Sequence, residues 1–416
     1  MKRIRRGASQ TLAQGFTLIE VIIAMLIGLI GVVVIMQTFA VSEGFKRTAT
    51  SGTDAQINGG IALYMLQREL RMAGYGMNSL MTMGCPSVRV YRSASSSGID
   101  MPLVPFMLNP TLVPAGDANT DTMLIAYGTS DSFVSGVTLQ ASPANLAAPF
   151  YLISNYDAFQ NGDLLVSVMP GAGAGGNASC VLHEATATWS AAGNCGHPPS
   201  SGTLGMLEHG QTSYQKHTSA GCVTTASTFN NGTGITDAGG AVEPNCTATG
   251  GCQVYGLGDA VVHVYAIRGG NLTMCDWIAS DCTNAANFNI AVNDIVSLRG
   301  VYGMNLDTAP SALPGDGHTI TWQRNALTTN VFLPSRVLAA TIEITARNSL
   351  KEKPTSGTAC NATLFSGRPD RGMDWLYQSM AGATIDISAS SADWQCYRYR
   401  LFQTSVPLRN LIWRPS

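Results

Sequence analysis

The sequence predicts an α+β protein in which one long N-terminal helix packs on an antiparallel β-sheet ectodomain. Residues 16–41 form an apolar run in which Glu20 is the only charged residue. Most of the remaining chain consists of short apolar runs separated by Gly, Pro, Ser and Asn, which is the pattern of strands joined by turns. Charged residues make up 12% of the chain, against about 25% in an average soluble domain. This composition favours β-structure with long turns over a helical bundle.

The apolar run is long enough to cross a membrane. As a helix it would reach roughly 39 Å, and the hydrocarbon core of a bilayer is about 30 Å thick. Four basic residues precede the run, namely Lys2, Arg3, Arg5 and Arg6. Because basic flanks stay on the cytoplasmic side, we expect a cytoplasmic N-terminus and an ectodomain on the other side.

Glu20 is the anomaly in this segment. A charged side chain at the centre of a bilayer costs on the order of 2.5–3.5 kcal/mol and less near a helix end, so an acid there indicates a functional site with a cationic partner. A secretory signal peptide would carry small residues after its apolar core, and Val41-Ser42-Glu43-Gly44 is a poor match. A plain signal anchor fits the length and orientation but leaves Glu20 unexplained.

A third interpretation comes from residues Gly15-Phe16-Thr17-Leu18-Ile19-Glu20. They resemble the processing site of type IV pilins and of type II secretion pseudopilins. The resemblance implies that a prepilin peptidase removes the leader 1–15 by cutting after Gly15 and methylates the new amine of Phe16. It also implies that Phe16, Thr17 and Glu20 act in assembly, with the Glu20 carboxylate pairing with a terminal amine.

The helix is expected to run from residue 16 to about 73, with residues 16–41 in the membrane. Ala24, Gly28 and Gly31 form a small-residue stripe where another helix can approach, although ordinary glycine content explains them equally well. Further along, Ile57, Ile61, Tyr64 and Met65 share one face and Leu63, Leu66 and Leu70 lie roughly opposite, so both sides of the helix could be covered. Gly74 and Gly76 are stop signals.

The ectodomain is expected in two parts, residues 74–169 and 252–416. The strands expected in it are 88–91, 122–127, 133–139, 150–154, 164–169, 260–267, 272–277, 294–306, 336–347 and 396–406. Arg268-Gly269-Gly270-Asn271 predicts a hairpin turn. In 336–347 the alternation predicts that Leu338 and every second residue after it form the apolar face.

Residues 170–251 differ from the rest of the ectodomain. They are rich in Gly, Ala, Ser, Thr and Asn and contain few apolar runs. We expect a Cys-rich loop insertion that disulfides hold in place, rather than a hydrophobic core.

The ten cysteines all follow the membrane segment, and no C-x-x-C occurs. In an oxidising compartment this favours disulfides over metal ligands. Connectivity cannot be read from the sequence, but Cys246–Cys252 and Cys275–Cys282 are plausible short-range pairs. Cys360–Cys396 would close the C-terminal region, much as many pilins close theirs.

Three further patches resemble PilW-type minor pilins: the helix end at 66–76, the strand Leu298-Arg299-Gly300-Val301-Tyr302-Gly303, and residues 336–344 with 402–410. The resemblance implies a pilus subunit that resides in the inner membrane with a periplasmic ectodomain and later lies at the cell surface. Its partners would be other minor and major pilins, the inner-membrane assembly platform and a large tip adhesin. A J-type pseudopilin of a type II secretion system, and an adhesin or DNA-binding tip module, are the alternatives.

The catalytic sequence motifs that we searched for do not accompany these features. The G-x-S-x-G, H-E-x-x-H and phosphate-loop patterns do not occur in the sequence, so we expect no enzyme and no cofactor. His183-Glu184 and Cys195-Gly196-His197 are weak metal candidates, and Asp307 and Asp316 are weak calcium candidates because Asp and Gly also dominate ordinary turns.

Charge is distributed unevenly along the chain. Residues 74–319 carry 5 basic and 16 acidic residues, whereas 320–416 carry 11 basic and 6 acidic. Two regions that face each other within one fold explain this best. A basic surface for an acidic neighbour or for nucleic acid is the less favoured interpretation.

Overall fold

The computed structural model describes residues 15–77, 88–92, 99–130, 136–139, 150–152, 159–169, 179–188, 205–210, 213–230, 252–305, 320–324, 337–352, 360, 363, 376–377, 380 and 384–412. The chain divides into two compact units, Met1–Thr53 and Asp54–Ser416. Each unit is described by itself.

Helix α1, Leu18–Met72, confirms the predicted long N-terminal helix. Its segment Leu18–Lys46 has a mean hydropathy of 3.0 and is long and apolar enough to cross a membrane. The helix ends at the predicted glycines, since Gly74 and Gly76 have φ values of +77° and +71°. Glycine adopts this left-handed conformation without strain, and the Gly74 N–H then donates to the carbonyl of Ala126 at 2.9 Å.

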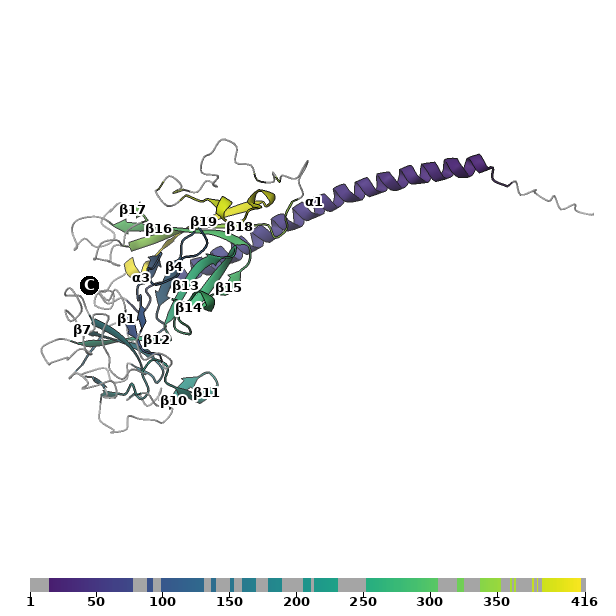
Figure 1. Ribbon diagram of the computed structural model, residues 1–416. Coiled ribbons are helices and arrows are strands. Elements are labelled where there is room, and N and C mark those ends of the chain that lie inside the picture. Colours follow the sequence, from purple (N-terminus) through teal and green to yellow (C-terminus); the bar gives the residue numbers. More distant parts are fainter. Residues whose placement is uncertain are drawn as a thin grey trace, which may run out of the picture. The chain divides into compact units, whose positions relative to one another are not determined.

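Two antiparallel sheets form the part of the ectodomain that packs on α1. Their strand orders are β15-β14-β13-β4-β3 and β17-β16-β18-β19. Figure 1 shows the C-terminal part of α1 running beside these strands. The strands are β3 (Phe106–Leu108), β4 (Met123–Tyr127), β13 (Val261–Arg268), β14 (Asn271–Asp276), β15 (Asn289–Val292), β16 (Ile295–Asn305), β17 (Ile320–Gln323), β18 (Val337–Arg347) and β19 (Tyr399–Pro407).

A third, six-stranded sheet has the order β2-β1-β8-β7-β12-β5, and two small two-stranded sheets pair β10 with β11 and β6 with β9. All described pairings are antiparallel except that of β1 with β8 and the single bridge Tyr91–Asn230. The strands are β1 (Val88–Val90), β2 (Ile99–Met101), β5 (Val137–Thr138), β6 (Phe150–Tyr151), β7 (Leu164–Met169), β8 (Ser179–Glu184), β9 (Met206–Leu207), β10 (Ser213–Thr218), β11 (Gly221–Ala226) and β12 (Gln253–Gly258). The short helices are η2 (Ala285–Asn287), η4 (Ile387–Ala389), η5 (Trp394–Cys396) and α3 (Arg409–Ile412).

Every strand expected from the sequence has a counterpart, and the agreement is best for the long ones. β5 and β6 are shorter than expected, and residues 131–135 and 153–158 lie outside the described residues. The predicted turn is present: Arg268 pairs with Asn271, and Gly269 and Gly270 have φ values of +59° and +72°, the type I′ geometry.

One face of α1 builds the main core. Ala62, Leu66 and Leu70 are fully buried and belong to one cluster with β4, β13, β16 and β18. The expectation that both sides could be covered is not met, because Ile57 and Ile61 remain exposed. The sequence could not distinguish these faces, since both are apolar.

Gly59 allows α1 to approach β19 closely. A Cβ added there would lie 2.0 Å from the Phe402 ring of β19, whereas a Cβ at the neighbouring Gly60 would meet nothing within 4 Å. Of the Gly59-Gly60 pair, only Gly59 is therefore required by packing.

Strand β18 corrects the predicted single apolar face. Ala340, Ile342 and Ile344 face the α1 core as expected. The alternate side, however, is also buried and carries Thr341, Glu343 and Thr345, none more than 2% exposed. The polar alternation indicated solvent, but residues far along the chain cover that side.

Within residues 170–251 the described strands depart from the expected loop insertion, whereas Cys180 and Cys222 are disulfide-bonded, as expected. β8 lies inside the six-stranded sheet between β1 and β7, and Leu182 and Phe229 belong to that sheet's apolar cluster. The low apolar content hid this strand, because its alternation is interrupted by the buried pair His183 and Glu184.

Two disulfides bond cysteines that the sequence paired, Cys275–Cys282 and Cys360–Cys396. Cys252 is also disulfide-bonded, but Cys246, its candidate partner, lies outside the described residues. The second bridge closes 36 residues between β18 and β19.

We predict that Gly59→Ala destabilises the unit Asp54–Ser416 by about 1–3 kcal/mol, the usual cost of overpacking a core. Gly60→Ala is the matched control. It adds a methyl group to open space and should stabilise the helix by up to about 1 kcal/mol. Thermal unfolding of both variants measures the difference, and equal melting temperatures would show that Phe402 does not restrict this position.

Candidate assembly site

The N-terminal motif forms a helix cap. Gly15, Phe16 and Thr17 precede the first helical residue, and Phe16 is 87% exposed. The backbone N–H and the hydroxyl of Thr17 both donate to Oε2 of Glu20, at 2.9 and 2.8 Å. The Thr17 hydroxyl in turn accepts from the Glu20 N–H at 3.4 Å. This is the capping box that the pattern T-x-x-E forms at a helix N-terminus.

The cap holds the Glu20 side chain through only one of its two carboxylate oxygens. Both bonds go to Oε2, so among the described residues Oε1 has no hydrogen-bond donor. The positive end of the helix dipole also favours a carboxylate in the first turn. Glu20 is therefore held at the start of the helix with one oxygen available to a second, cationic donor.

The small residues of the membrane segment lie beside open space in the described part of the chain. Ala24 and Gly28 are exposed, and a Cβ at Gly28 or Gly31 would meet no atom within 4 Å. Their role in helix packing stays a prediction.

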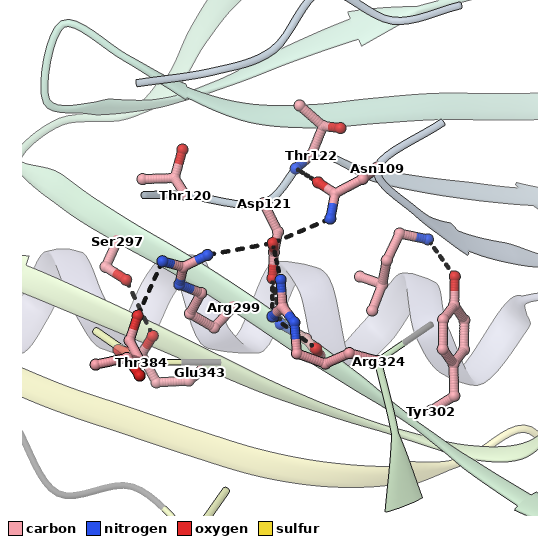
Figure 2. A network of polar contacts seen from close by, with 12 residues as sticks. Asn109, Thr120, Asp121, Thr122, Ser297, Arg299, Tyr302, Arg324, Glu343 and Thr384 are labelled. Atoms are coloured by element: carbon pink, nitrogen blue, oxygen red, sulfur yellow. Dashed lines mark hydrogen bonds and ion pairs between the residues drawn. The ribbon is translucent and has the colours of Figure 1, made fainter. Parts of the chain in front are cut away.

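A second polar cluster lies inside the ectodomain, centred on Asp121 (Figure 2). Asp121 precedes β4 and is 1% exposed. Arg324 donates two hydrogen bonds to its carboxylate at 2.6 and 2.7 Å. Asn109, the Gly300 N–H and Arg299 donate to it at 3.1, 3.0 and 3.3 Å.

Arg299 extends this cluster across β16 to Glu343. Arg299 and Glu343 are register partners on β16 and β18, and the second guanidinium nitrogen of Arg299 donates to the Thr384 carbonyl at 2.9 Å. Glu343 is fully buried and accepts from Ser297 at 3.1 Å and from Thr345. Burial raises the pKa of Glu343 to about 7, although both hydroxyl bonds and the Arg299 charge oppose that shift.

A polar row thus crosses the outer side of the four-stranded sheet. It continues from Glu343 to its partner Gln403 on β19, whose side-chain oxygen accepts from the Leu376 N–H at 3.3 Å. Described residues between β18 and β19 contact the row through the Thr384 carbonyl and the Leu376 N–H. Ile385 and Ile387 pack in the adjoining apolar cluster.

Both carboxylates of this cluster are buried. Asp121 accepts five hydrogen bonds, whereas Glu343 accepts two. Ser167 and His183 form another buried pair, with Oγ and Nε2 2.9 Å apart. Burial and the neighbouring His209 lower the pKa of His183 well below its usual value, and Ser167 is only 4% exposed.

Among the described residues, the weak metal candidates His183 and Glu184 belong to no group that could hold a metal ion. The Glu184 carboxylate accepts from the Tyr214 and Ser227 hydroxyls and from the Thr228 N–H. Among the residues that the structure describes, no group of three His, Cys, Asp or Glu could hold a metal ion. Cys195, His197, Asp307 and Asp316 lie outside those residues.

Comparison with known proteins identifies only the N-terminal segment. Residues 11–36 match the family model of the prokaryotic N-terminal methylation motif. No curated protein and no solved structure matches the chain. The motif supports a type IV pilin-like or pseudopilin protein, and it implies processing by a prepilin peptidase, assembly with other pilins and anchoring in a membrane.

Gly15, Phe16, Thr17 and Glu20 were predicted from one short stretch of sequence, and their roles in processing and assembly stay predictions. Sequence reasoning missed the Asp121 cluster, whose members come from residues 12 to 203 positions apart. An isolated Asp before a strand resembles any turn residue, so no local signal could have found it.

We predict that Glu343→Gln makes the ectodomain more stable at pH 8 and changes it little at pH 4.5. The folded chain holds a proton up to about pH 7 that the unfolded chain releases near pH 4.5. The stability due to this proton is therefore full at low pH and is lost as pH rises towards 7. The shift sets an upper bound on the order of 3 kcal/mol.

Chemical denaturation across this pH range measures the effect. Glu352→Gln, which alters a carboxylate paired with Arg398 near the surface, is the control. A wild-type slope that persists in Glu343→Gln would assign the pH dependence to another group.

Proposed function

We propose that this chain is a minor pilin of a type IV pilus, resembling the PilW type: a non-enzymatic subunit that helps to start the filament and lies at its tip. The observation that best supports this proposal is the capped acid at the start of an apolar helix, together with the matched methylation motif. The disulfide-bonded β ectodomain supports a subunit that functions outside the cytoplasm.

Assembly uses the new N-terminus. Cleavage after Gly15 leaves the Phe16 amine, a cation at neutral pH, four residues before Glu20. The capping box holds Glu20 and leaves Oε1 for the amine of a neighbouring subunit. In a low-dielectric filament core an uncompensated charge costs several kcal/mol, so this pair selects the register at which a subunit leaves the membrane.

The partners are those that processing and assembly require. A prepilin peptidase removes the leader, the inner-membrane assembly platform extracts the subunit, and other minor and major pilins receive it. A large tip adhesin is the further partner that a tip position offers, with adhesion and twitching motility as the cellular outcomes.

We predict that the mature protein begins at Phe16 and carries an N-methyl group. Cutting after Gly15 and methylating the exposed amine would give this terminus. N-terminal sequencing and intact-mass measurement of the protein from its own host check it. A chain that still carries residues 1–15, or one cut beyond residue 41, would contradict the processing proposal.

We predict that Glu20→Ala and Glu20→Gln spare cleavage and export but lower filament incorporation about tenfold or more, because a lost buried pair is worth several kcal/mol. Gln still completes a capping box, so this pair of variants separates the cap from the charge. Immunoblots of sheared filaments and of membranes measure it. If Glu20→Gln enters filaments at the wild-type level, the cap rather than the ion pair is what assembly needs.

A J-type pseudopilin is the second candidate, because the motif is common to both systems. The large ectodomain and its many cysteines favour the pilus. Deletion distinguishes the two: loss of a minor pilin abolishes piliation and twitching, whereas loss of a pseudopilin leaves exoenzymes in the periplasm.

A further inference from the structure

A groove lies between the last turns of α1 and the place where β4 ends and β13 begins. Its volume is about 460 Å³, which is within the range of small-molecule sites. Helix α1 contributes Tyr64, Gln67, Arg68 and Arg71 to the lining, and β4 contributes Tyr127. All five belong to the same compact unit of the chain. The groove shares no residue with the N-terminal assembly site.

The polar groups of this groove have no partner in the described part of the chain. Arg68 and Arg71 are exposed, and neither side chain forms an ion pair or a hydrogen bond with a described residue. The Gln67 amide and the hydroxyls of Tyr64 and Tyr127 likewise make no hydrogen bond to a described residue. Two cations and three hydrogen-bonding groups therefore line the groove with their bonding capacity unused.

The two arginines favour an anionic ligand. They are three residues apart on α1, so their guanidinium groups lie on one side of the helix. The end of a helix ordinarily repels an anion through its free carbonyls. Here, however, the Asn410 amide donates to the carbonyls of residues 71–73 at 3.4, 3.1 and 3.2 Å. Since arginine binds carboxylates through paired N–H groups, Arg68 and Arg71 can hold a carboxylate at this end of α1.

Two tyrosine rings give the groove apolar surfaces on its helix side and on its sheet side. Tyr64 is 68% exposed and Tyr127 is half-buried. Burial raises the pKa of Tyr127 and the Arg68 charge opposes that rise, so the hydroxyl of Tyr127 lies near a cation of the groove. Tyrosine combines an apolar ring with a polar tip. A sugar ring is complementary, because its faces carry C–H groups and its rim carries hydroxyls.

Two other anionic partners fit this groove less well. An extended peptide is commonly held by backbone pairing at a sheet edge, but β4 and β13 are inner strands of the five-stranded sheet. A nucleic acid needs a basic path for its repeated phosphates. Residues 74–319, which supply the sheet side, carry 5 basic and 16 acidic residues. The groove therefore suits a ring with a single negative charge.

We infer that this groove binds the terminal residue of an acidic glycan, a pyranose ring that carries one carboxylate. Arg68 and Arg71 bind the carboxylate. Tyr64 and Tyr127 pack against the ring, and the Gln67 amide bonds to its hydroxyls. Glycan binding is a further activity, since it uses none of the residues of the assembly site.

The test uses the full-length chain, purified in a detergent without a sugar headgroup, and methyl β-glucuronide as the probe. Saturation-transfer NMR measures binding. A ligand of about 14 non-hydrogen atoms at ordinary ligand efficiency has a Kd on the order of 1 mM. Methyl β-glucoside has the same ring without the carboxylate. It should bind about fivefold more weakly or worse, because it lacks two exposed ion pairs.

Variants assign the binding to the groove. Arg68→Gln combined with Arg71→Gln should remove the preference for the glucuronide, so that both sugars bind equally weakly. Arg400→Gln changes an exposed arginine of β19 outside the groove. It is the matched control and should leave both affinities unchanged. Tyr64→Ala should weaken both sugars about two- to tenfold, whereas Tyr64→Phe keeps the ring and should not.

Equal affinity of the wild-type chain for the two sugars, or no saturable binding of the glucuronide, overturns the inference. So does a loss in Arg400→Gln equal to that in the double variant. An acidic peptide or a thymidine oligonucleotide that binds more tightly through the same arginines also overturns it. Purified protein suffices for these measurements, so their failure leaves the proposed pilin function as it stands.

Discussion

The Asp121 carboxylate is the interaction on which the ectodomain most depends. It lies where the five-stranded sheet meets β16 of the four-stranded sheet, and it accepts five hydrogen bonds from Asn109, Arg299, Gly300 and Arg324. A buried carboxylate is stable only when such donors replace water. The donors come from three separate stretches of chain, so one acid aligns β3, β4, β16 and the end of β17. The helix packs on the sheets that this cluster aligns.

Glu343 is also a buried carboxylate, but it accepts fewer hydrogen bonds. Its hydroxyl partners Ser297 and Thr345 supply two bonds, fewer than Asp121 receives, and burial raises its pKa. The polar row from Arg299 through Glu343 to Gln403 is contacted by described residues between β18 and β19. Thr384 and Leu376 supply backbone partners to the row, and Ile385 and Ile387 add apolar cover beside it.

Helix α1 has three parts with different properties. Its start is a capping box that positions Glu20, its first half is apolar on every side, and its second half buries Ala62, Leu66 and Leu70 in the core. On the other side of this half, Ile57, Ile61 and Tyr64 are left exposed by the described residues.

The sequence by itself determined the features that rest on contiguous residues. These features are the processing motif, the apolar span, the glycine stop at Gly74 and the Gly269-Gly270 turn. Each depends on neighbours within a few positions, so the sequence alone predicts it. Tertiary structure alone decided the burial of Thr341 and Glu343, the place of β8 inside a sheet and the Asp121 cluster. Their partners are remote in sequence, and alternation or composition reports only what a segment exposes locally. Whether a polar face meets water or a distant donor is decided by what folds over it.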